Sequence, residues 1–196
     1  MQNKLLAYTA LGALCIMLAC SAAATTLAAV EPAEIQVPAW FKISFLDLPE
    51  DMKEAAAGKK RVMIYFGQNG CPYCKRLMEV NFKQPEIVGK LRRNFDLIEL
   101  NILGSREVSW IDGVARTEKD FARFLQVRYT PTLLVIDEHG SILARINGYY
   151  PPAPFSAAID YVVNGDYRKE PDLRRYLRNR GEPMPEAGSR VDSAVQ

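Results

Sequence analysis

The pattern of apolar and polar residues changes its period several times along the chain. Short apolar runs rich in β-branched and aromatic residues are typical of strands and occur at residues 61–66, 95–102, 132–136 and 142–146. Apolar residues spaced three and four apart are typical of helices and occur at residues 49–58, 71–82, 86–93, 117–126 and 154–164. The order strand, helix, strand, helix, hairpin, helix predicts an α/β fold with a central mixed β-sheet flanked by helices.

Local signals add detail to this pattern. The run at residues 61–66 is almost entirely apolar, which predicts a central strand covered on both faces. Thr117, with Asp120 three residues later, predicts a helix start that resembles a capping box. The stretch at residues 105–116 shows no clear period and is expected to be irregular. Its tryptophan, Trp110, is expected to belong to the core.

The first 29 residues have the pattern of an export signal. Lys4 is the only charged residue before Glu31, and an apolar core at residues 5–19 is followed by small residues. This order of charged, apolar and small-residue regions predicts a secretory signal peptide at residues 1–29, which is absent from the mature protein.

Two alternatives remain open for this segment. The uncharged stretch at residues 5–30 is long enough to cross a bilayer, so the chain can instead keep it as a membrane anchor. The residues before Cys20 resemble a lipoprotein signal, and Cys20 can then carry a lipid. Each of the three alternatives places the rest of the chain outside the cytoplasm.

The remaining residues divide into three parts. Residues 30–58 are predicted to form an N-terminal linker and extension, because the linker is rich in proline and acidic residues. Residues 59–180 contain all the predicted strands and are expected to form one domain closed by C-terminal helices. Residues 181–196 are predicted to form a flexible tail.

Composition and cysteine count limit the possible functions. The 196 residues are 48% hydrophobic and 24% charged, which fits one ordinary globular domain with extensions. A net charge of +2 without a long basic run argues against nucleic-acid binding. The four cysteines form two unlike pairs, Cys15 with Cys20 and Cys71 with Cys74. The only histidine, His139, lies in the predicted hairpin turn, so ligands for zinc are lacking and no metal is expected.

The Cys71-Pro72-Tyr73-Cys74 motif begins the predicted helix that follows the first strand. A helix N-terminus presents unpaired N–H groups and a partial positive charge, which stabilise a thiolate and lower the thiol pKa. Cys71 is therefore the expected nucleophile. Cys74 lies one turn later on the same face, where it can resolve a mixed disulfide on Cys71. Pro72 suits the first helical position, since the N–H that it lacks would be unpaired there.

A second motif, Arg128-Tyr129-Thr130-Pro131-Thr132, precedes the third strand. Together with the cysteine pair, it resembles the thioredoxin superfamily over residues 61–163. The resemblance is closest to SoxW-like periplasmic thioredoxins, which share an insertion like that at residues 105–116 and a Cys-Pro-Tyr-Cys motif. It implies the thioredoxin fold, a cis Pro131 that faces the cysteines, and a Thr130 backbone that pairs with a substrate chain. The implied substrate-binding residues are Pro72, Tyr73, Thr130 and Pro131.

The chain departs from the thioredoxin pattern at two positions. Gly70 stands where thioredoxins usually have tryptophan before the first cysteine. Tyr65 stands where they usually have a buried aspartate that assists proton transfer from the second cysteine. Glu79 and a water molecule are two candidates for the role of that carboxylate, and the sequence leaves the choice open.

The resemblance implies a thiol–disulfide oxidoreductase that needs no cofactor. We expect a periplasmic disulfide reductase, whose partners are a protein disulfide or thiol substrate and a membrane protein that supplies electrons. A SoxW-like role implies a substrate in sulfur oxidation that carries sulfur on a cysteine, and a cytochrome c maturation partner is a rival.

Three alternatives to a reductase stay open. One is a disulfide oxidase or isomerase of the Dsb type. Another is glutaredoxin activity, against which stands the Thr130-Pro131-Thr132 sequence, because glutaredoxins usually have Thr-Val-Pro at this place. The third is a non-catalytic binding module that uses the helix at residues 172–180 as its handle, although this helix is expected to dock on its own domain.

Overall fold

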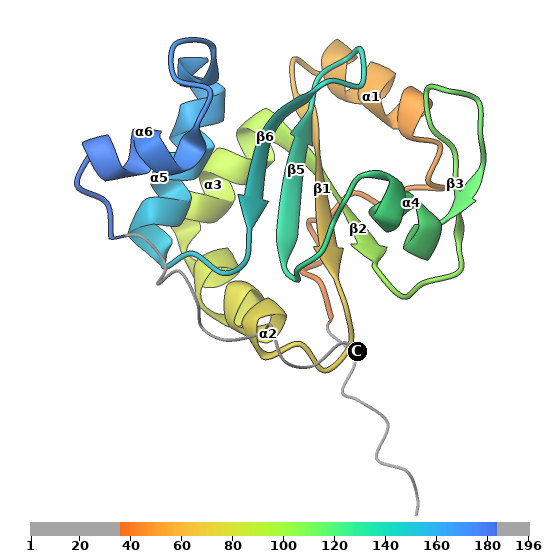
Figure 1. Cartoon of the computed structure of the whole chain (residues 1–196), viewed down its shortest axis with the longest axis horizontal. Coiled ribbons are helices and arrows are strands. Elements are labelled where there is room, and N and C mark those ends of the chain that lie inside the picture. Colours follow the sequence, from red (N-terminus) through yellow and green to blue (C-terminus); the bar gives the residue numbers. More distant parts are fainter. Residues whose placement is uncertain (1–35, 184–196) are drawn as a thin grey trace, which may run out of the picture. The chain divides into compact units, whose positions relative to one another are not determined.

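A computed structural model of the protein describes residues 36–183, and the predicted signal peptide and most of the predicted tail lie outside this range. Its main sheet has the strand order β2-β1-β5-β6 (Figure 1). Strand β1 pairs in parallel with β2 and antiparallel with β5, and β5 pairs antiparallel with β6. The strands are β1 (Arg61–Gly67), β2 (Phe95–Asn101), β5 (Thr132–Ile136) and β6 (Ile142–Asn147). The sheet is mixed, as the sequence predicts.

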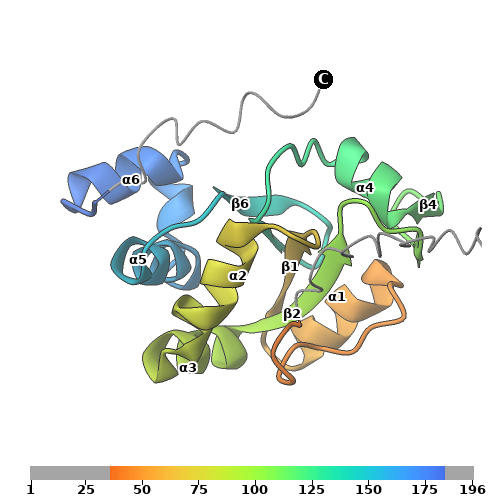
Figure 2. The same ribbon diagram turned by 90° about the horizontal axis from the view of Figure 1, so that it is seen from below.

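Helices cover both faces of this sheet (Figure 2). Met63 and Tyr65 of β1 pack with residues of the helices on one face, whereas Val62, Ile64 and Phe66 pack with those on the other. Every residue of β1 after Arg61 is therefore buried, which confirms the predicted central strand. The first face carries α2 (Pro72–Glu79), α3 (Pro85–Asn94) and α5 (Pro152–Val163), and the second carries α1 (Leu48–Ala57) and α4 (Glu118–Phe124).

The predicted helix at residues 71–82 is divided in the structure. Helix α2 ends at Glu79, and a short 3-10 helix, η1 (Asn81–Lys83), leads to α3. The break turns the Asn81 side chain into the core, where its Nδ2 donates a hydrogen bond of 3.0 Å to the carbonyl oxygen of Tyr150. This buried bond ties η1 to the loop before α5, a contact that no local sequence pattern reports.

The insertion at residues 105–116 is less irregular than predicted. It contains strand β3 (Glu107–Val108), which pairs antiparallel with β4 (Arg116–Thr117). Trp110 is 6% exposed and its ring packs 5.3 Å from that of Phe121, which confirms its place in the core. Thr117 caps α4 as predicted, since its Oγ1 accepts a hydrogen bond from the Asp120 N–H.

A buried carboxylate, which the sequence did not reveal, holds the insertion to the sheet. Glu118 is 2% exposed and accepts hydrogen bonds from the backbone N–H groups of Asn101 and Arg106. The Arg106 guanidinium donates a further bond of 2.7 Å to the same carboxylate. Glu118 therefore joins the end of β2 to the insertion, and the burial of its charge is compensated by three donors.

A helix before the predicted domain and the helix that closes it both contribute to the core. Leu48, Met52 and Ala55 of α1 are buried against the sheet, although residues 30–58 were expected to be an extension. Helix α6 (Leu173–Asn179) buries Leu173 and Leu177, which confirms that it docks on its own domain. No helix within residues 36–183 has the length and apolarity needed to span a membrane.

We predict that Glu118→Ala destabilises the domain by about 2–3 kcal/mol, because it leaves buried donors without their acceptor. Glu118→Gln, which keeps one acceptor oxygen, should cost less. The exposed Glu107 on the same insertion provides the control, and Glu107→Ala should change the stability by less than about 0.5 kcal/mol. The measurement is the free energy of unfolding from urea titrations. Equal effects at the two positions would contradict the role of Glu118.

Candidate active site

The turn between β1 and α2 places the first cysteine at a helix N-terminus. Strand β1 ends at Gly67, and Gly70 has a φ of +75°, a left-handed conformation that glycine adopts without strain. Cys71 is the N-cap residue of α2, and its Sγ accepts a hydrogen bond of 3.1 Å from the Cys74 N–H. Pro72 occupies the first turn, as predicted. The Cys71 sulfur therefore takes the place that a serine or aspartate oxygen usually has at a helix start.

The two thiols of the motif differ in access to solvent. Both are free in this structure, so it represents the reduced protein. Cys71 retains 6% exposure and Cys74 has none. An incoming sulfur atom can therefore reach Cys71 first, whereas Cys74 lies behind it in the core.

The loop before β5 lies directly against the Cys71 sulfur. The Thr130–Pro131 peptide bond is cis, as the resemblance implies. The Thr130 Oγ1 donates a hydrogen bond of 3.3 Å to Cys71 Sγ, and the Cys71 thiol lies 3.5 Å from the Thr130 carbonyl oxygen. These contacts join residues 59 positions apart in the chain. The structure thus brings together both motifs that the sequence singled out.

These contacts shift the pKa values of the two cysteines in opposite directions. The Cys74 thiol donates to the Cys71 sulfur, and the Thr130 hydroxyl and the backbone N–H of Cys74 add further bonds. Together they outweigh burial and lower the pKa of Cys71 to about 6. The same bond to Cys71, followed by burial, raises the pKa of Cys74 well above its ordinary value. One negative charge is therefore held on the outer sulfur.

Glu79 does not take the place of the aspartate that thioredoxins usually bury near the second cysteine. Glu79, one of the two candidates, is exposed on α2 and lies 3.9 Å from the Lys75 ammonium. Glu79 is therefore not the substitute, because its side chain points to solvent. Tyr65 occupies the position itself and is 1% exposed.

Comparison with known proteins agrees with this geometry. The sequence profile of the family described as a thioredoxin-like domain matches residues 48–163. The chain belongs to this thioredoxin-like family. The match begins at α1, which agrees with the buried side chains that this helix contributes. No curated protein sequence matches the chain.

Solved structures show the same fold. A thioredoxin-fold protein from Helicobacter pylori is 25% identical, with a TM-score of 0.54 over 62% of this chain and 81% of that one. A putative disulphide-isomerase from Bacteroides thetaiotaomicron is 22% identical, with a TM-score of 0.50 over 66% of this chain and 97% of that one. These similarities confirm the thioredoxin fold and its mixed sheet, but they do not test the resemblance to SoxW-like proteins.

Tyrosine side chains neighbour residues of both motifs in this thioredoxin-like domain. Tyr73, a predicted substrate-binding residue, is half-buried beside Cys71, and Pro72 is exposed. Two more tyrosines were missed from the sequence. Tyr129 is 49% exposed next to Thr130, and Tyr149 packs under the Arg76 guanidinium at 4.9 Å. The sequence signals that could have identified them are the position of Tyr129 directly before the predicted Thr130 and the position of Tyr149 just after strand β6.

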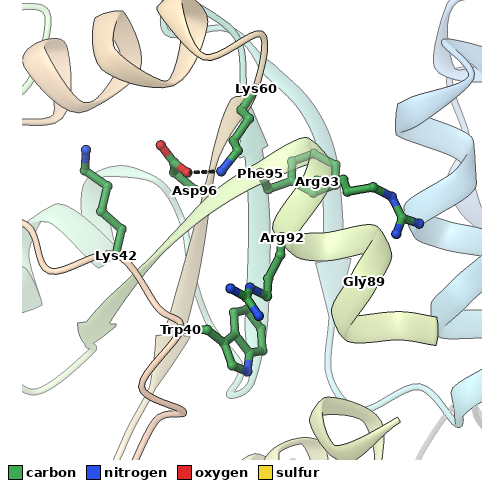
Figure 3. A pocket seen from close by; sticks show the side chains of 8 residues that line it. All are labelled: Trp40, Lys42, Lys60, Gly89, Arg92, Arg93, Phe95 and Asp96. Carbon is green, nitrogen blue, oxygen red and sulfur yellow. Dashed lines mark hydrogen bonds and ion pairs between the residues drawn. The ribbon is translucent and has the colours of Figure 1, made fainter. Parts of the chain in front are cut away.

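A separate basic pocket lies at the other end of the sheet. It has a volume of about 620 Å³ and its lining includes Lys60 and Asp96, at the starts of β1 and β2 (Figure 3). Lys60 Nζ forms an ion pair with Asp96 Oδ1 at 3.0 Å, so part of the positive charge of the pocket is compensated. Since β1 extends by about 3.3 Å per residue, its seven residues separate this pocket from the cysteines. Within residues 36–183, no three metal-ligating side chains lie together.

We predict that the alkylation rate of Cys71 by iodoacetamide follows a titration with a midpoint near pH 6. Below that pH the thiolate is protonated and the rate falls. Thr130→Val removes a hydrogen bond to the thiolate, and we expect it to raise the midpoint by about one pH unit. The remote Thr117→Val variant should leave the midpoint unchanged. An unchanged midpoint in Thr130→Val would contradict the role of this hydroxyl.

Proposed function

We propose that this protein is a thiol–disulfide oxidoreductase that reduces a disulfide in a partner protein outside the cytoplasm. The observation that carries the proposal is the Cys71 sulfur at the start of α2, with a lowered pKa and partial access to solvent. Family membership and the free Cys74 one turn behind support the same activity.

The proposed reaction has two displacements at sulfur. The Cys71 thiolate attacks one sulfur of the partner disulfide, forms a mixed disulfide and releases the other partner sulfur as a thiolate. Cys74 then attacks Cys71 Sγ, which breaks the mixed disulfide and releases the second partner thiol. The partner gains two electrons and two protons, and the Cys71–Cys74 pair is left oxidised. A membrane protein that supplies two electrons is the proposed source of regeneration.

The pKa of the attacking cysteine supports reduction over oxidation. A strongly stabilised thiolate favours the reduced enzyme and makes the disulfide oxidising, as in DsbA, whose cysteine pKa is about 3.5. The pKa of Cys71, about 6, lies closer to the value of about 7 in thioredoxin. An oxidase or isomerase is therefore the less favoured alternative.

Location and substrate rest on the sequence. The signal or anchor expected at residues 1–29 supports a periplasmic site of action. The resemblance to SoxW-like proteins supports a substrate in sulfur oxidation, with a cysteine that carries sulfur. The alternative of a non-catalytic binding module is less favoured. The apolar side chains of α6, which were to contact its partner, are buried against the domain.

We predict that Cys71→Ser and Cys74→Ser fail in different ways when insulin is the test disulfide. Cys71→Ser removes the nucleophile and should reduce turnover to background. Cys74→Ser should still attack but remain trapped as a mixed disulfide, which non-reducing electrophoresis and mass spectrometry detect. Ser141→Ala, in the hairpin turn away from the motif, is the matched control. Turnover by Cys71→Ser at the wild-type rate would contradict the proposed function.

The reduction potential tests the proposed direction. Equilibration of the soluble domain against dithiothreitol should give a potential near about −270 mV, as in thioredoxin. A potential near about −120 mV, as in DsbA, would identify an oxidant and reverse the direction proposed for the pair.

A further inference from the structure

The Tyr65 side chain reaches the active site from beneath. It extends from β1 into the core face that also contains Met63, Cys71 and Cys74. Its ring packs edge-on against Phe41, with centroids 6.1 Å apart, and only 1% of the residue is exposed. The phenol is therefore fixed within the core, near the cysteine pair.

The backbone leaves room for the Tyr65 hydroxyl. A Cβ atom at Gly67 would lie 2.4 Å from Tyr65 Oη, so a larger residue there would displace the hydroxyl. The same oxygen is buried and has no hydrogen-bond partner among the described residues. An unpaired buried hydroxyl is unfavourable. The Tyr65 hydroxyl is therefore a free hydrogen-bond donor in the reduced protein. It can donate to a charged acceptor that forms nearby later in the reaction.

The ionisable groups that face this hydroxyl come from two elements. Cys74 and Cys71 lie on the α2 side, and Glu99 lies on the neighbouring strand β2. Burial, and after it the nearby groups of Cys74, Cys71 and Glu99, raises the pKa of Tyr65 far above its ordinary value. The phenol therefore keeps its proton over the physiological range and can act as a hydrogen-bond donor. Tyr65 also acts on Cys74: its hydroxyl lowers the pKa of Cys74, whereas Cys71 and burial raise it.

We propose that Tyr65 assists the second displacement by donating a hydrogen bond from its hydroxyl to the Cys74 sulfur as that sulfur becomes a thiolate. This inference rests on the proposed function, since it assigns a residue to the resolution step. It follows from the buried, unpaired hydroxyl and from the position of Cys74 next to it.

The assisted step balances without a further reagent. The Cys74 thiol gives up its proton, its sulfur forms a bond to Cys71 Sγ, and the bond from Cys71 Sγ to the partner sulfur breaks. The electron pair of the broken bond leaves with the partner sulfur, which takes up the proton released by Cys74 and departs as a thiol. Tyr65 keeps its own proton throughout. It therefore differs from a buried carboxylate, which could itself accept the Cys74 proton.

The test uses the reduced domain and the chromogenic disulfide of 5-thio-2-nitrobenzoate. Attack by Cys71 releases one thionitrobenzoate, and resolution by Cys74 releases the second, so absorbance separates the two steps. Tyr65→Phe keeps the ring against Phe41 and removes only the hydroxyl. We expect the second phase to slow by about tenfold or more, as for a lost hydrogen bond to a charged group, with the first phase within about twofold of wild type.

A second buried tyrosine provides a matched control. Tyr161 belongs to the same core face and is also 1% exposed, but its hydroxyl donates a hydrogen bond of 2.6 Å to the Glu170 carbonyl oxygen. Tyr161→Phe should lower the melting temperature by about 2–4 °C and leave both phases unchanged. Tyr65→Phe should leave the melting temperature unchanged or raise it, because no bond of the reduced state is lost.

Each outcome has a distinct meaning. A second phase of Tyr65→Phe within about twofold of wild type would overturn the role of the hydroxyl. Equal slowing of both phases together with a lower melting temperature would also overturn it, since that pattern indicates a structural role. If the wild-type domain releases one thionitrobenzoate and forms no Cys71–Cys74 disulfide, the proposed function itself fails.

Discussion

The contact on which the site depends is the hydrogen bond from the Cys74 N–H to the Cys71 sulfur at the first turn of α2. It makes a sulfur atom the cap of a helix, and the cap position faces the positive end of the helix dipole. This placement requires a rigid support, because a shift of a few tenths of an ångström would weaken the bond. Strand β1 supplies that support, since it is buried on both faces and ends three residues before Gly70, whose left-handed backbone leads into the N-cap residue Cys71.

Sheet topology explains how a distant loop reaches the same sulfur. Strand β5 runs antiparallel to β1, and Thr132 is paired with Phe66. The start of β5 and the end of β1 therefore lie at the same end of the sheet. This brings Thr130 Oγ1 to within 3.3 Å of Cys71 Sγ. The fold thus combines one local contact, within α2, with one long-range contact, across the sheet. Groups of the helix and of the loop both contribute to the lowered pKa of Cys71, and the bond from the Cys74 thiol contributes most.

The features that the sequence predicted share a local origin. Strand and helix periods, the cap at Thr117 and the motif at Cys71 all depend on neighbouring residues, and the structure reproduces these elements within a few positions. Among the features that were missed are buried polar groups whose partners lie far along the chain. Glu118 is held by Asn101 and Arg106, and Asn81 by Tyr150. Their burial follows from how segments pack, so composition and spacing carry no signal for it.

The two cysteines need opposite protonation states at different steps of the reaction. In the reduced protein the bond that stabilises the Cys71 thiolate also holds the proton on Cys74. That bond is lost when Cys71 enters the mixed disulfide, but burial still opposes a thiolate on Cys74. A buried carboxylate would help to remove that proton, but its negative charge near the Cys71 thiolate would oppose the low pKa on which the first displacement depends. A neutral phenol adds no charge to the reduced site. Tyr65 therefore reconciles a stable Cys71 thiolate with a later thiolate on Cys74, and it does so because the phenol keeps its proton in the core.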